Sequence, residues 1–352
     1  MSMREINILL TAVGRRAYLV EYFKEALRGT GGKVYAANCV RDTTGLLAAD
    51  DFEIVPKSAD PGYVDSLVEL CRRWRITLLF SLHDWDAPVI ARNRERFLAV
   101  GTTPVMGDAS LLSTCLDKHS TASAMEGIGV AVPWTTLSLP DAAAKMRELR
   151  CQMIVKPRWG QGSLGLFKVY SEKELEWAFN LSDVMARRFA ANCPEIDVSQ
   201  PQVVVQQFVS GEEYGCDIVN GLDGQFRRAF VKHKLGMRAG ETDAAESVDM
   251  PSIAVAAEKV GRWSRHLGSM DSDWIVGDDG VPCLVELNPR FGGGYPFTHL
   301  SGANVVKACV DWANGVDDWS WCSGFRTGVR IGKTIGMRIF DDSRGRHHAV
   351  GS

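Results

Sequence analysis

The sequence has no long apolar run, no excess of charge of one sign and no clustered cysteines. Its N-terminal apolar run, Ile6–Val13, is too short for a membrane span and is not flanked like a signal peptide. The 40 basic and 43 acidic residues give a net charge of −3, which predicts no general attraction to nucleic acid or to a membrane surface. The nine cysteines form no C-x-x-C pair, so we predict reduced, mostly buried thiols in a cytoplasmic protein.

Several cofactor and catalytic motifs are also missing. The first turn, TAVGRRAY at residues 11–18, contains one glycine and lacks the G-x-G-x-x-G of dinucleotide-binding folds, which disfavours a nicotinamide oxidoreductase. There is no G-x-x-x-x-G-K-[ST] phosphate loop and no Ser/His/Asp arrangement for nucleophilic catalysis. Any anion must therefore be held by a local set of residues of another kind.

The first hundred or so of the 352 residues predict alternating strands and helices. Strands are expected at 6–13, 33–38, 53–56 and 77–81, and helices up to Leu27 and over 63–74. This alternation is typical of a parallel sheet with helices on its faces, so we predict a Rossmann-like domain. The segment Ser81–Asp86, SLHDWD, follows a strand where open α/β sheets bind ligands. Asp84 and Asp86 are candidate substrate contacts, or caps of the following helix.

A glycine-rich hairpin is expected in the middle of the chain. Met153–Tyr170, MIVKPRWGQGSLGLFKVY, predicts two strands around a loop. Glycines let a backbone fold over phosphates and point amide groups at them, and a nearby lysine supplies positive charge. The loop is either a phosphate-binding flap or a mobile turn. Its residues of interest are Lys156, Gly160, Gly162, Ser163 and Gly165.

The remaining pattern is mixed. Helices are expected at 117–127, 141–149, 172–179 and 253–267, and strands at 134–138, 203–209, 212–219 and 225–234. Val203–Val209, VVVQQFV, predicts either a buried strand or a hinge whose backbone binds the edge of a flat base. We expect a loop at 236–245, because this stretch is too polar for a core. Asp271 and Asp273 lie just before the next apolar run.

The most informative stretch is Cys283–Gly294, CLVELNPRFGGG. In an extended strand, positions i, i+2 and i+4 share one face, so Glu286, Asn288 and Arg290 are expected side by side. Hard oxygen ligands suit Mg²⁺ and arginine suits phosphate, which favours a divalent cation with a polyphosphate at this face. A solvated edge strand is the alternative.

Taken together, these features resemble the ATP-grasp superfamily of carboxylate–amine ligases, in particular the branch related to carbamoyl phosphate synthetase. The resemblance implies an α/β protein with a Rossmann-like domain over residues 1–115. A small ATP-grasp subdomain with the phosphate flap would cover 116–205, and a large subdomain with the metal and phosphate site 206–352. The single ATP-grasp unit, without a glutaminase-like Cys/His arrangement, disfavours a carbamoyl phosphate synthetase itself.

The resemblance also implies roles for individual residues, with ATP and Mg²⁺ or Mn²⁺ as cofactors. ATP contacts are expected from Lys118, Lys156, the flap residues Gly160, Gly162 and Ser163, the adenine hinge Gln206, Gln207, Phe208 and Val209, and the ribose contact Glu213, or its neighbour Glu212. Metal ligands are expected to be Asp273, Glu286 and Asn288, and catalytic residues Glu286, Asn288 and Arg290. Gln206 stands where the family usually has an acid, so the adenine contact is expected from the backbone.

The implied reaction is transfer of the γ-phosphate of ATP to a carboxylate, followed by attack of an amine on the acylphosphate. The mixed charges of the loop at 232–246 favour amino-acid substrates, although its side chains could equally be solvated. Candidate substrate contacts are Asp84, Lys234, Arg238, Glu241 and Gly293. Another acylphosphate-forming reaction and a non-catalytic ATP sensor are the alternatives. Homodimers are common among related proteins. Arg290→Ala or Glu286→Gln is expected to lower turnover by orders of magnitude and to leave the fold intact.

Overall fold

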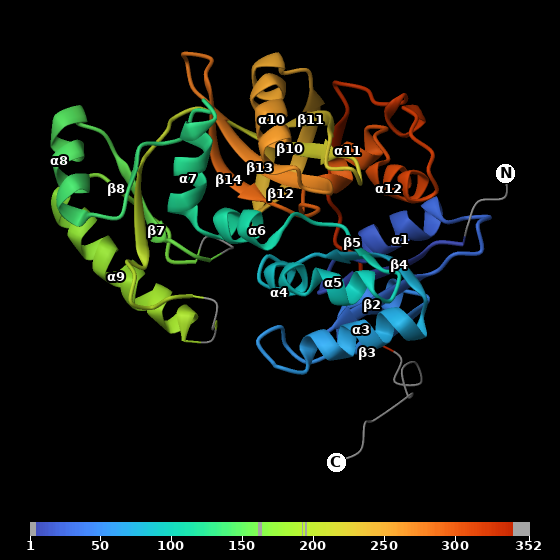
Figure 1. Cartoon of the computed structure of the whole chain (residues 1–352). Coiled ribbons are helices and arrows are strands. Elements are labelled where there is room, and N and C mark those ends of the chain that lie inside the picture. The colour runs from blue at the N-terminus through green and yellow to red at the C-terminus, as the bar shows by residue number, and fades with distance from the viewer. Residues whose placement is uncertain (1–4, 161–163, 192, 194–195, 341–352) are drawn as a thin grey trace.

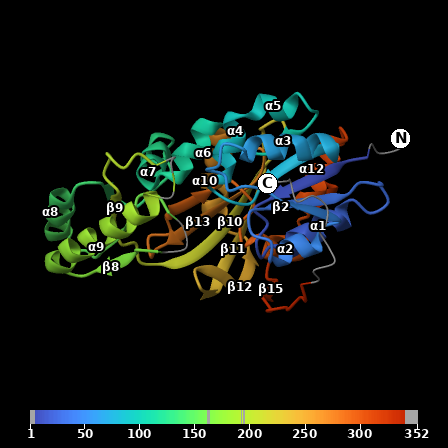
Figure 2. The same ribbon diagram turned by 90° about the horizontal axis from the view of Figure 1, so that it is seen from below.

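The computed structural model describes residues 5–160, 164–191, 193 and 196–340 of the 352-residue chain. Gly162 and Ser163 of the predicted flap lie outside the described residues. Within the described part, the strands belong to three sheets. Figures 1 and 2 show the smallest sheet, with α8 and α9, at one end of the molecule and the N-terminal sheet at the other. The third sheet lies between them.

The N-terminal sheet of the described chain has five strands in the order β3-β2-β1-β4-β5, and every pairing is parallel. Its strands are β1 (Asn7–Thr11), β2 (Val34–Asn38), β3 (Asp51–Ile54), β4 (Ile76–Ser81) and β5 (Thr103–Pro104), and its helices are α1 (Ala17–Ala26), α2 (Thr44–Ala48), α3 (Tyr63–Arg73), α4 (Asp86–Arg92) and α5 (Arg94–Leu98). The predicted Rossmann-like domain is confirmed.

Helices cover both faces of this sheet, which explains why β1 is buried along its whole length and apolar at its three central positions. Ile8 and Leu10 point to the face covered by α1, where they pack with Leu19 and Phe23. Leu9 points to the opposite face and belongs to the cluster that contains Leu67 of α3. A strand buried on both sides cannot alternate between apolar and polar residues.

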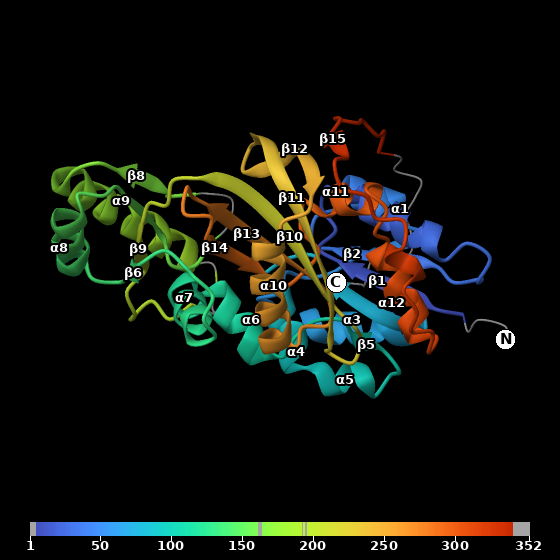
Figure 3. The same ribbon diagram turned by 90° about the horizontal axis from the view of Figure 1, so that it is seen from above.

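The central sheet has six strands in the described residues, in the order β14-β13-β10-β11-β12-β15. All its pairings are antiparallel. Its strands are β10 (Glu212–Asn220), β11 (Phe226–Arg238), β12 (Glu241–Val248), β13 (Gly268–Val276), β14 (Pro282–Asn288) and β15 (Arg330–Gly332), and the accompanying helices are α10 (Pro251–Ser264), α11 (Tyr295–Leu300), α12 (Val305–Ala313) and η1 (Ser320–Cys322). Figure 3 shows this sheet from above.

The smallest sheet has the order β6-β9-β7-β8 in the described chain. It comprises β6 (Thr135–Thr136), β7 (Met153–Pro157), β8 (Phe167–Val169) and β9 (Val203–Gln207), with helices α8 (Leu139–Leu149) and α9 (Glu172–Ala190). Two further helices, α6 (Ala109–Leu116) and α7 (Lys118–Gly127), connect the N-terminal domain to this sheet. The predicted boundary between residues 205 and 206 falls inside β9, which pairs with β7 as far as Gln207.

The predicted loop at 236–245 is wrong, because this segment forms the end of a hairpin between β11 and β12. Ala239 and Gly240 both have positive φ, as the preferred two-residue hairpin turns require. Several residues of this segment have low strand propensity, and the pairing between β11 and β12 holds them in an extended conformation. The helix expected to begin over 172–179 continues to Ala190.

Six of the nine cysteines are buried, as the prediction of mostly buried thiols requires. In the described residues, no helix combines the length and apolar character needed to cross a membrane.

Candidate functional site

The predicted acid and amide of β14 lie on one face of the central sheet. Asp273 of β13 lies directly opposite Glu286, and Asp271 lies opposite Asn288. Directly paired residues of antiparallel strands share a face, so three carboxylates and one amide converge there. The strand ends at Asn288. Arg290 therefore follows in a turn instead of extending the row, and its backbone N–H donates to the Asn288 carbonyl at 2.8 Å.

Arg290 pairs with Asp84 of the N-terminal domain. Arg290 Nη2 donates to Asp84 Oδ2 at 2.9 Å, and Nε lies 2.7 Å from Oδ1 without hydrogen-bond geometry. Burial opposes ionisation of Asp84, but Arg290 outweighs it and lowers the pKa of this carboxyl. The ion pair joins two residues that are 206 positions apart. It also places Asp84, a predicted substrate contact, beside the predicted catalytic arginine.

Lys234 of β11 is buried among two of the predicted site acids. Its ammonium group lies 2.7 Å from Asp273 Oδ1 and 3.8 Å from Glu213 Oε2, and its side chain is 7% exposed. Burial opposes protonation, but the pKa of Lys234 is raised because Asp273 lies next to it. The alternative of a solvated lysine is therefore wrong. Glu212, by contrast, is 71% exposed and contacts His233.

Two lysines meet near the glycine loop. Lys118 Nζ, at the start of α7, donates to the Gly160 carbonyl at 2.8 Å. The pKa of Lys156 at the end of β7 is lowered to about 8, because burial disfavours its charged form and Lys118 adds repulsion. Burial also lowers the pKa of Lys118, although the negative charge of Glu286 acts to raise it. Two desolvated cations close together favour the binding of an anion between them.

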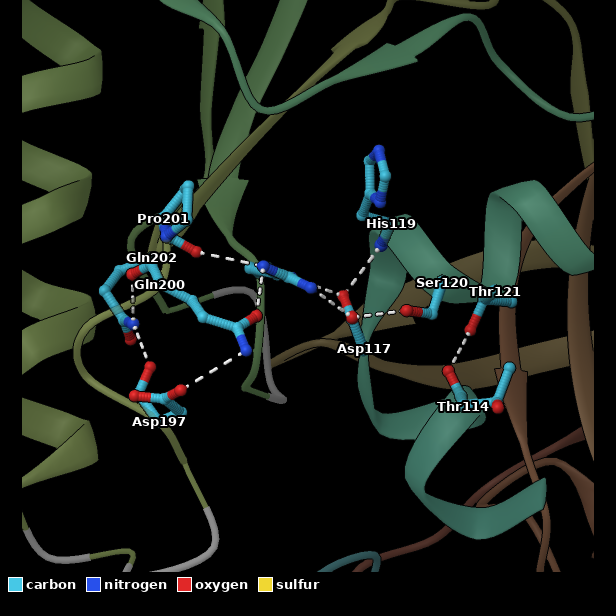
Figure 4. A network of polar contacts seen from close by, with 10 residues as sticks. Thr114, Asp117, His119, Ser120, Thr121, Asp197, Gln200, Pro201 and Gln202 are labelled. Atoms are coloured by element: carbon cyan, nitrogen blue, oxygen red, sulfur yellow. Dashed lines mark hydrogen bonds and ion pairs between the residues drawn. The ribbon is translucent and has the colours of Figure 1, made fainter. Parts of the chain in front are cut away.

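A buried network fixes the position of Lys118 relative to the small sheet (Figure 4). Arg158 donates to both carboxylate oxygens of Asp117, from Nε and from Nη2, each at 2.7 Å. Asp117 is also the N-cap of α7, because its side chain accepts from the His119 N–H. On the other side, Arg158 Nη1 donates to Gln200 Oε1 at 3.2 Å. The sequence analysis gave Arg158 no role. Its position two residues after Lys156 could have indicated that this charged residue belongs to the site.

The predicted adenine hinge follows the strand β9. The Gln206 side chain is buried and donates to Thr135 Oγ1 at 3.0 Å. The Gln207 N–H donates to the Trp134 carbonyl and the Phe208 N–H to the Gln152 carbonyl, each at 2.9 Å. Within the described residues, no hydrogen bond is found for the Val209 N–H. Val209 is therefore the hinge position with a backbone donor available for a base.

These elements surround one open cleft. Its free volume is about 640 Å³, which includes the part that is open to solvent. Its polar wall holds predicted site residues from the central sheet, from the small sheet, from α7 and from the loops after β4 and β7, and its remaining wall is largely apolar. The polar wall comprises Asp84, Lys118, Gly160, Gln206, Glu286 and Asn288. The cleft thus brings together residues that are far apart in the sequence.

The other predicted substrate contacts lie near the hairpin turn. Arg238 is 52% exposed and pairs with Asp243, so it is held by its own hairpin. Glu241 contacts Arg15 of the N-terminal domain at 3.0 Å and Lys333 at 3.5 Å. A Cβ atom on Gly293 would lie 3.5 Å from the Glu241 side chain.

Two further charged residues were given no role in the sequence analysis. Lys232 forms a fully buried ion pair with Asp217, with 2.6 Å between Nζ and Oδ2. Asp271 faces Gly292 so closely that a Cβ atom there would lie 2.2 Å from its carboxyl carbon. Burial, with Asp273 close by, raises the pKa of Asp271 to about 6. Nothing in the local sequence distinguishes Lys232 and Asp271 from the polar residues that strands ordinarily carry.

The donor set fits a magnesium–nucleotide complex. Glu286 and Asn288 present oxygen atoms on one face of β14, and Asp273 adds another from the facing strand. Mg²⁺ usually takes one or two carboxylates together with phosphate oxygens and water. In the described residues, no group of three or more His, Cys, Asp or Glu side chains is arranged to hold a metal ion.

Two family models match the chain. One, described as a PylC-like N-terminal domain, matches residues 8–105, and the other, described as an ATP-grasp domain, matches residues 115–294. Among curated proteins, the D-alanine–D-alanine ligase of Clostridium beijerinckii is 30% identical over 202 residues, which are 53% of this chain and 61% of that protein. The arginine-specific carbamoyl phosphate synthase large chain of Bacillus subtilis is 24% identical over 160 residues, 43% of this chain and 14% of that protein. The chain thus spans less than two thirds of either relative.

Solved structures share the fold over nearly the whole chain. The biotin carboxylase domain of 2-oxoglutarate carboxylase from Hydrogenobacter thermophilus, solved with MgADP, ADP and bicarbonate, has a TM-score of 0.73 at 13% identity, over 94% of this chain and 74% of its own. The L-amino acid ligase of Bacillus licheniformis has a TM-score of 0.65 at 20% identity, over 92% and 78%. These likenesses confirm the predicted fold class. With the ATP-grasp model matching half of its length, this chain belongs to the ATP-grasp family.

Proposed function

We propose that this protein is an ATP-dependent carboxylate–amine ligase with amino acids as substrates. In this reaction, the γ-phosphate of ATP moves to a carboxylate and gives an acylphosphate and ADP. An amine then attacks the acyl carbon, which forms the amide bond and releases phosphate. The observation that carries the proposal is one cleft lined by Lys118, Glu286 and Asn288, with a second desolvated lysine, Lys156, close enough to Lys118 and Glu286 to feel their charges.

The proposed roles follow from position. Lys118 and Lys156 would hold the phosphate chain, Val209 would donate to the adenine, and Glu213 would contact the ribose. Asp273, Glu286 and Asn288 would hold Mg²⁺, which supplies charge neutralisation when bound. Phosphoryl transfer depends on positioning and electrostatics more than on a protein nucleophile, and this suits a site rich in lysine, arginine and carboxylate.

Arg290 is proposed to steady the transferred phosphoryl group. Its guanidinium lies at the end of the strand that carries Glu286 and Asn288, and its contact with Asp84 holds it in place. Arginine presents several N–H donors in a fixed plane and so suits oxygen-rich anions. The D-alanine–D-alanine ligase match supports a reaction that joins amino acids in preference to other acylphosphate chemistry.

The test measures phosphate release from MgATP with amino acids, singly and in pairs, and with bicarbonate alone. We expect one amino acid to accelerate release at least tenfold, and a second to be found in an amide product by mass. Glu286→Gln should lower this rate by orders of magnitude. Glu258→Gln is the matched control, because Glu258 lies on the surface of α10 paired with Arg262.

Stimulation by bicarbonate alone would replace the amide-forming reaction with carboxyphosphate chemistry. Phosphate release that depends on no carboxylate, or that survives in Glu286→Gln, would refute the proposal.

A further inference from the structure

The loops after β1 and β4 meet at the point where the order of the N-terminal sheet reverses. In the order β3-β2-β1-β4-β5, β1 and β4 are neighbours. The helix after β1 packs on one face of the sheet through Leu19, and the helix after β4 packs on the other through Ile90. Between two such connections, open α/β sheets leave a crevice at the carboxyl ends of the strands, where ligands bind.

A guanidinium group lies at this crevice. Arg16, in the loop after β1, donates from Nη1 to the carbonyl of Leu82 in the loop after β4. Leu82 lies two residues before Asp84, which pairs with Arg290 of the central sheet. Arg16 and Arg290 therefore reach the same crevice from two different domains. Burial lowers the pKa of Arg16, and Arg290 lowers it further.

The nearby carboxylates are engaged by other cations. Asp84 is held by Arg290, while Glu241 is held by Arg15 and Lys333. Among the residues that the structure describes, Arg16 has no carboxylate within ion-pair distance. A partly buried cation without a counter-charge is unfavourable. An incoming anion would supply that counter-charge.

We propose that Arg16 and Arg290 frame an oxoanion site at the β1–β4 crevice. The ligand is a carboxylate of the substrate or the phosphoryl group transferred to it, because both present oxygens that match the planar fork of a guanidinium. The identity of the ligand rests on the proposed ligase function, whereas the existence of the site does not. Arg16 thereby makes the N-terminal domain a part of the substrate site.

The test uses the full chain with saturating MgADP, and in parallel without nucleotide. Thermal unfolding is followed while sodium acetate or inorganic phosphate replaces sodium chloride at constant ionic strength. A ligand that binds only the folded state raises the melting temperature in a saturable way. We expect a rise of about 2 °C for the wild type and none for Arg16→Met. Arg16→Lys, which keeps the charge and loses the fork, should retain part of the rise.

The matched control is Arg15→Met. Arg15 is the preceding residue and carries the same charge, but its side chain is 81% exposed and paired with Glu241. This variant should respond to anions like the wild type. The melting temperature without added anion shows whether Arg16→Met has a folding defect, which is then distinguished from a loss of anion binding. If Arg16→Met does not fold, Arg16→Lys is used in its place.

A rise with acetate that depends on Arg16 supports the site and assigns it to a carboxylate. A rise with phosphate alone supports the oxoanion site and assigns it to the phosphoryl group. No rise with either anion, or the same rise in Arg16→Met, overturns the proposal. If no carboxylate accelerates phosphate release but the Arg16-dependent rise persists, the ligase function fails and the oxoanion site stands.

Discussion

Lys156 shows how burial tunes a single side chain at the proposed phosphate site. Its pKa is lowered to about 8 by burial and by the nearby Lys118. Bound phosphate favours the protonated lysine, so nucleotide binding should be accompanied by proton uptake above this pH.

We therefore predict that affinity for a non-hydrolysable MgATP analogue is constant below pH 8. Above it, affinity should fall by up to about tenfold per pH unit. Calorimetric titrations between pH 7 and 9.5 measure this. Lys156→Arg should flatten the profile, because a guanidinium stays protonated throughout the range. An unchanged slope in Lys156→Arg, with a flat profile in Lys118→Arg, would instead assign the titration to Lys118.

Arg290 shows that a residue proposed to act in catalysis can also be structural. Its ion pair with Asp84 is about nine-tenths buried on both sides. Removing one partner of such a pair leaves an uncompensated charge. The sequence-based expectation that Arg290→Ala leaves the fold intact does not follow from this geometry.

We predict that Arg290→Ala lowers the free energy of unfolding by about 2–4 kcal/mol. Asp84→Asn/Arg290→Ala should recover part of that loss, because no carboxylate is then left unpaired. Urea unfolding of both variants checks this. Equal stability of the single and the double variant would show that the pair contributes nothing to folding, and Glu286→Gln remains the cleaner test of catalysis.

At the scale of elements, the Asp117–Arg158 pair joins α7 to the end of β7. Both side chains are 9% exposed, and the same carboxylate caps α7. Lys118 directly follows Asp117 and Lys156 lies two positions before Arg158, so we expect the pair to set the distance between the proposed phosphate contacts.

Arg158→Leu should lower the free energy of unfolding by about 3 kcal/mol, because Asp117 loses its counter-charge in a buried position. Asp117→Asn/Arg158→Leu should restore part of this, since asparagine can still cap the helix. Denaturant unfolding measures both effects. As a control, Arg187→Leu breaks an exposed pair with Asp183 on α9 and should cost less than about 1 kcal/mol.

The same variants separate positioning from stability. If the pair positions the lysines, Arg158→Leu should weaken binding of MgATP at least tenfold and leave adenosine binding unchanged. A purely structural role predicts equal losses for both ligands. Titration of the folded variant at low temperature with each ligand distinguishes the two outcomes.

At the scale of the whole molecule, His266 links the central sheet to the chain that leaves the N-terminal domain. Its Nδ1 accepts the Gly107 N–H at 3.0 Å, and the side chain is 2% exposed. Burial lowers the pKa of His266 to about 3, against an ordinary value of 6.5. The unfolded chain therefore binds the proton more readily, so stability is lost as pH falls below 6.5.

We predict that lowering the pH from 7 to 5 costs the wild type about 2 kcal/mol more than it costs His266→Asn. Asparagine does not titrate, and its side-chain oxygen can still accept the Gly107 N–H. Urea unfolding of both proteins at the two pH values gives the difference. Identical pH dependence would mean that His266 keeps an ordinary pKa in the folded protein.

Much of the architecture could be predicted from local patterns. The apolar run in β1 and the 3.6-residue periodicity of α3 indicated buried parallel strands and covering helices, and both elements lie within a few residues of their predicted ends. The hairpin at 236–245 could not be predicted, because Gly236 and Glu241 have low strand propensity and only pairing across the sheet holds them.

The sequence by itself determined that Glu286 and Asn288 share a face, because a strand alternates its side chains whatever surrounds it. It also determined the order of lysine, glycine loop and acidic strand that indicates the ATP-grasp family. Only the tertiary structure decided that Arg290 pairs with Asp84, that Arg158 holds Asp117 and that Arg16 lies at the β1–β4 crevice. These contacts join residues that are far apart in the sequence, and no local rule of backbone geometry or periodicity relates positions that meet only when the chain packs.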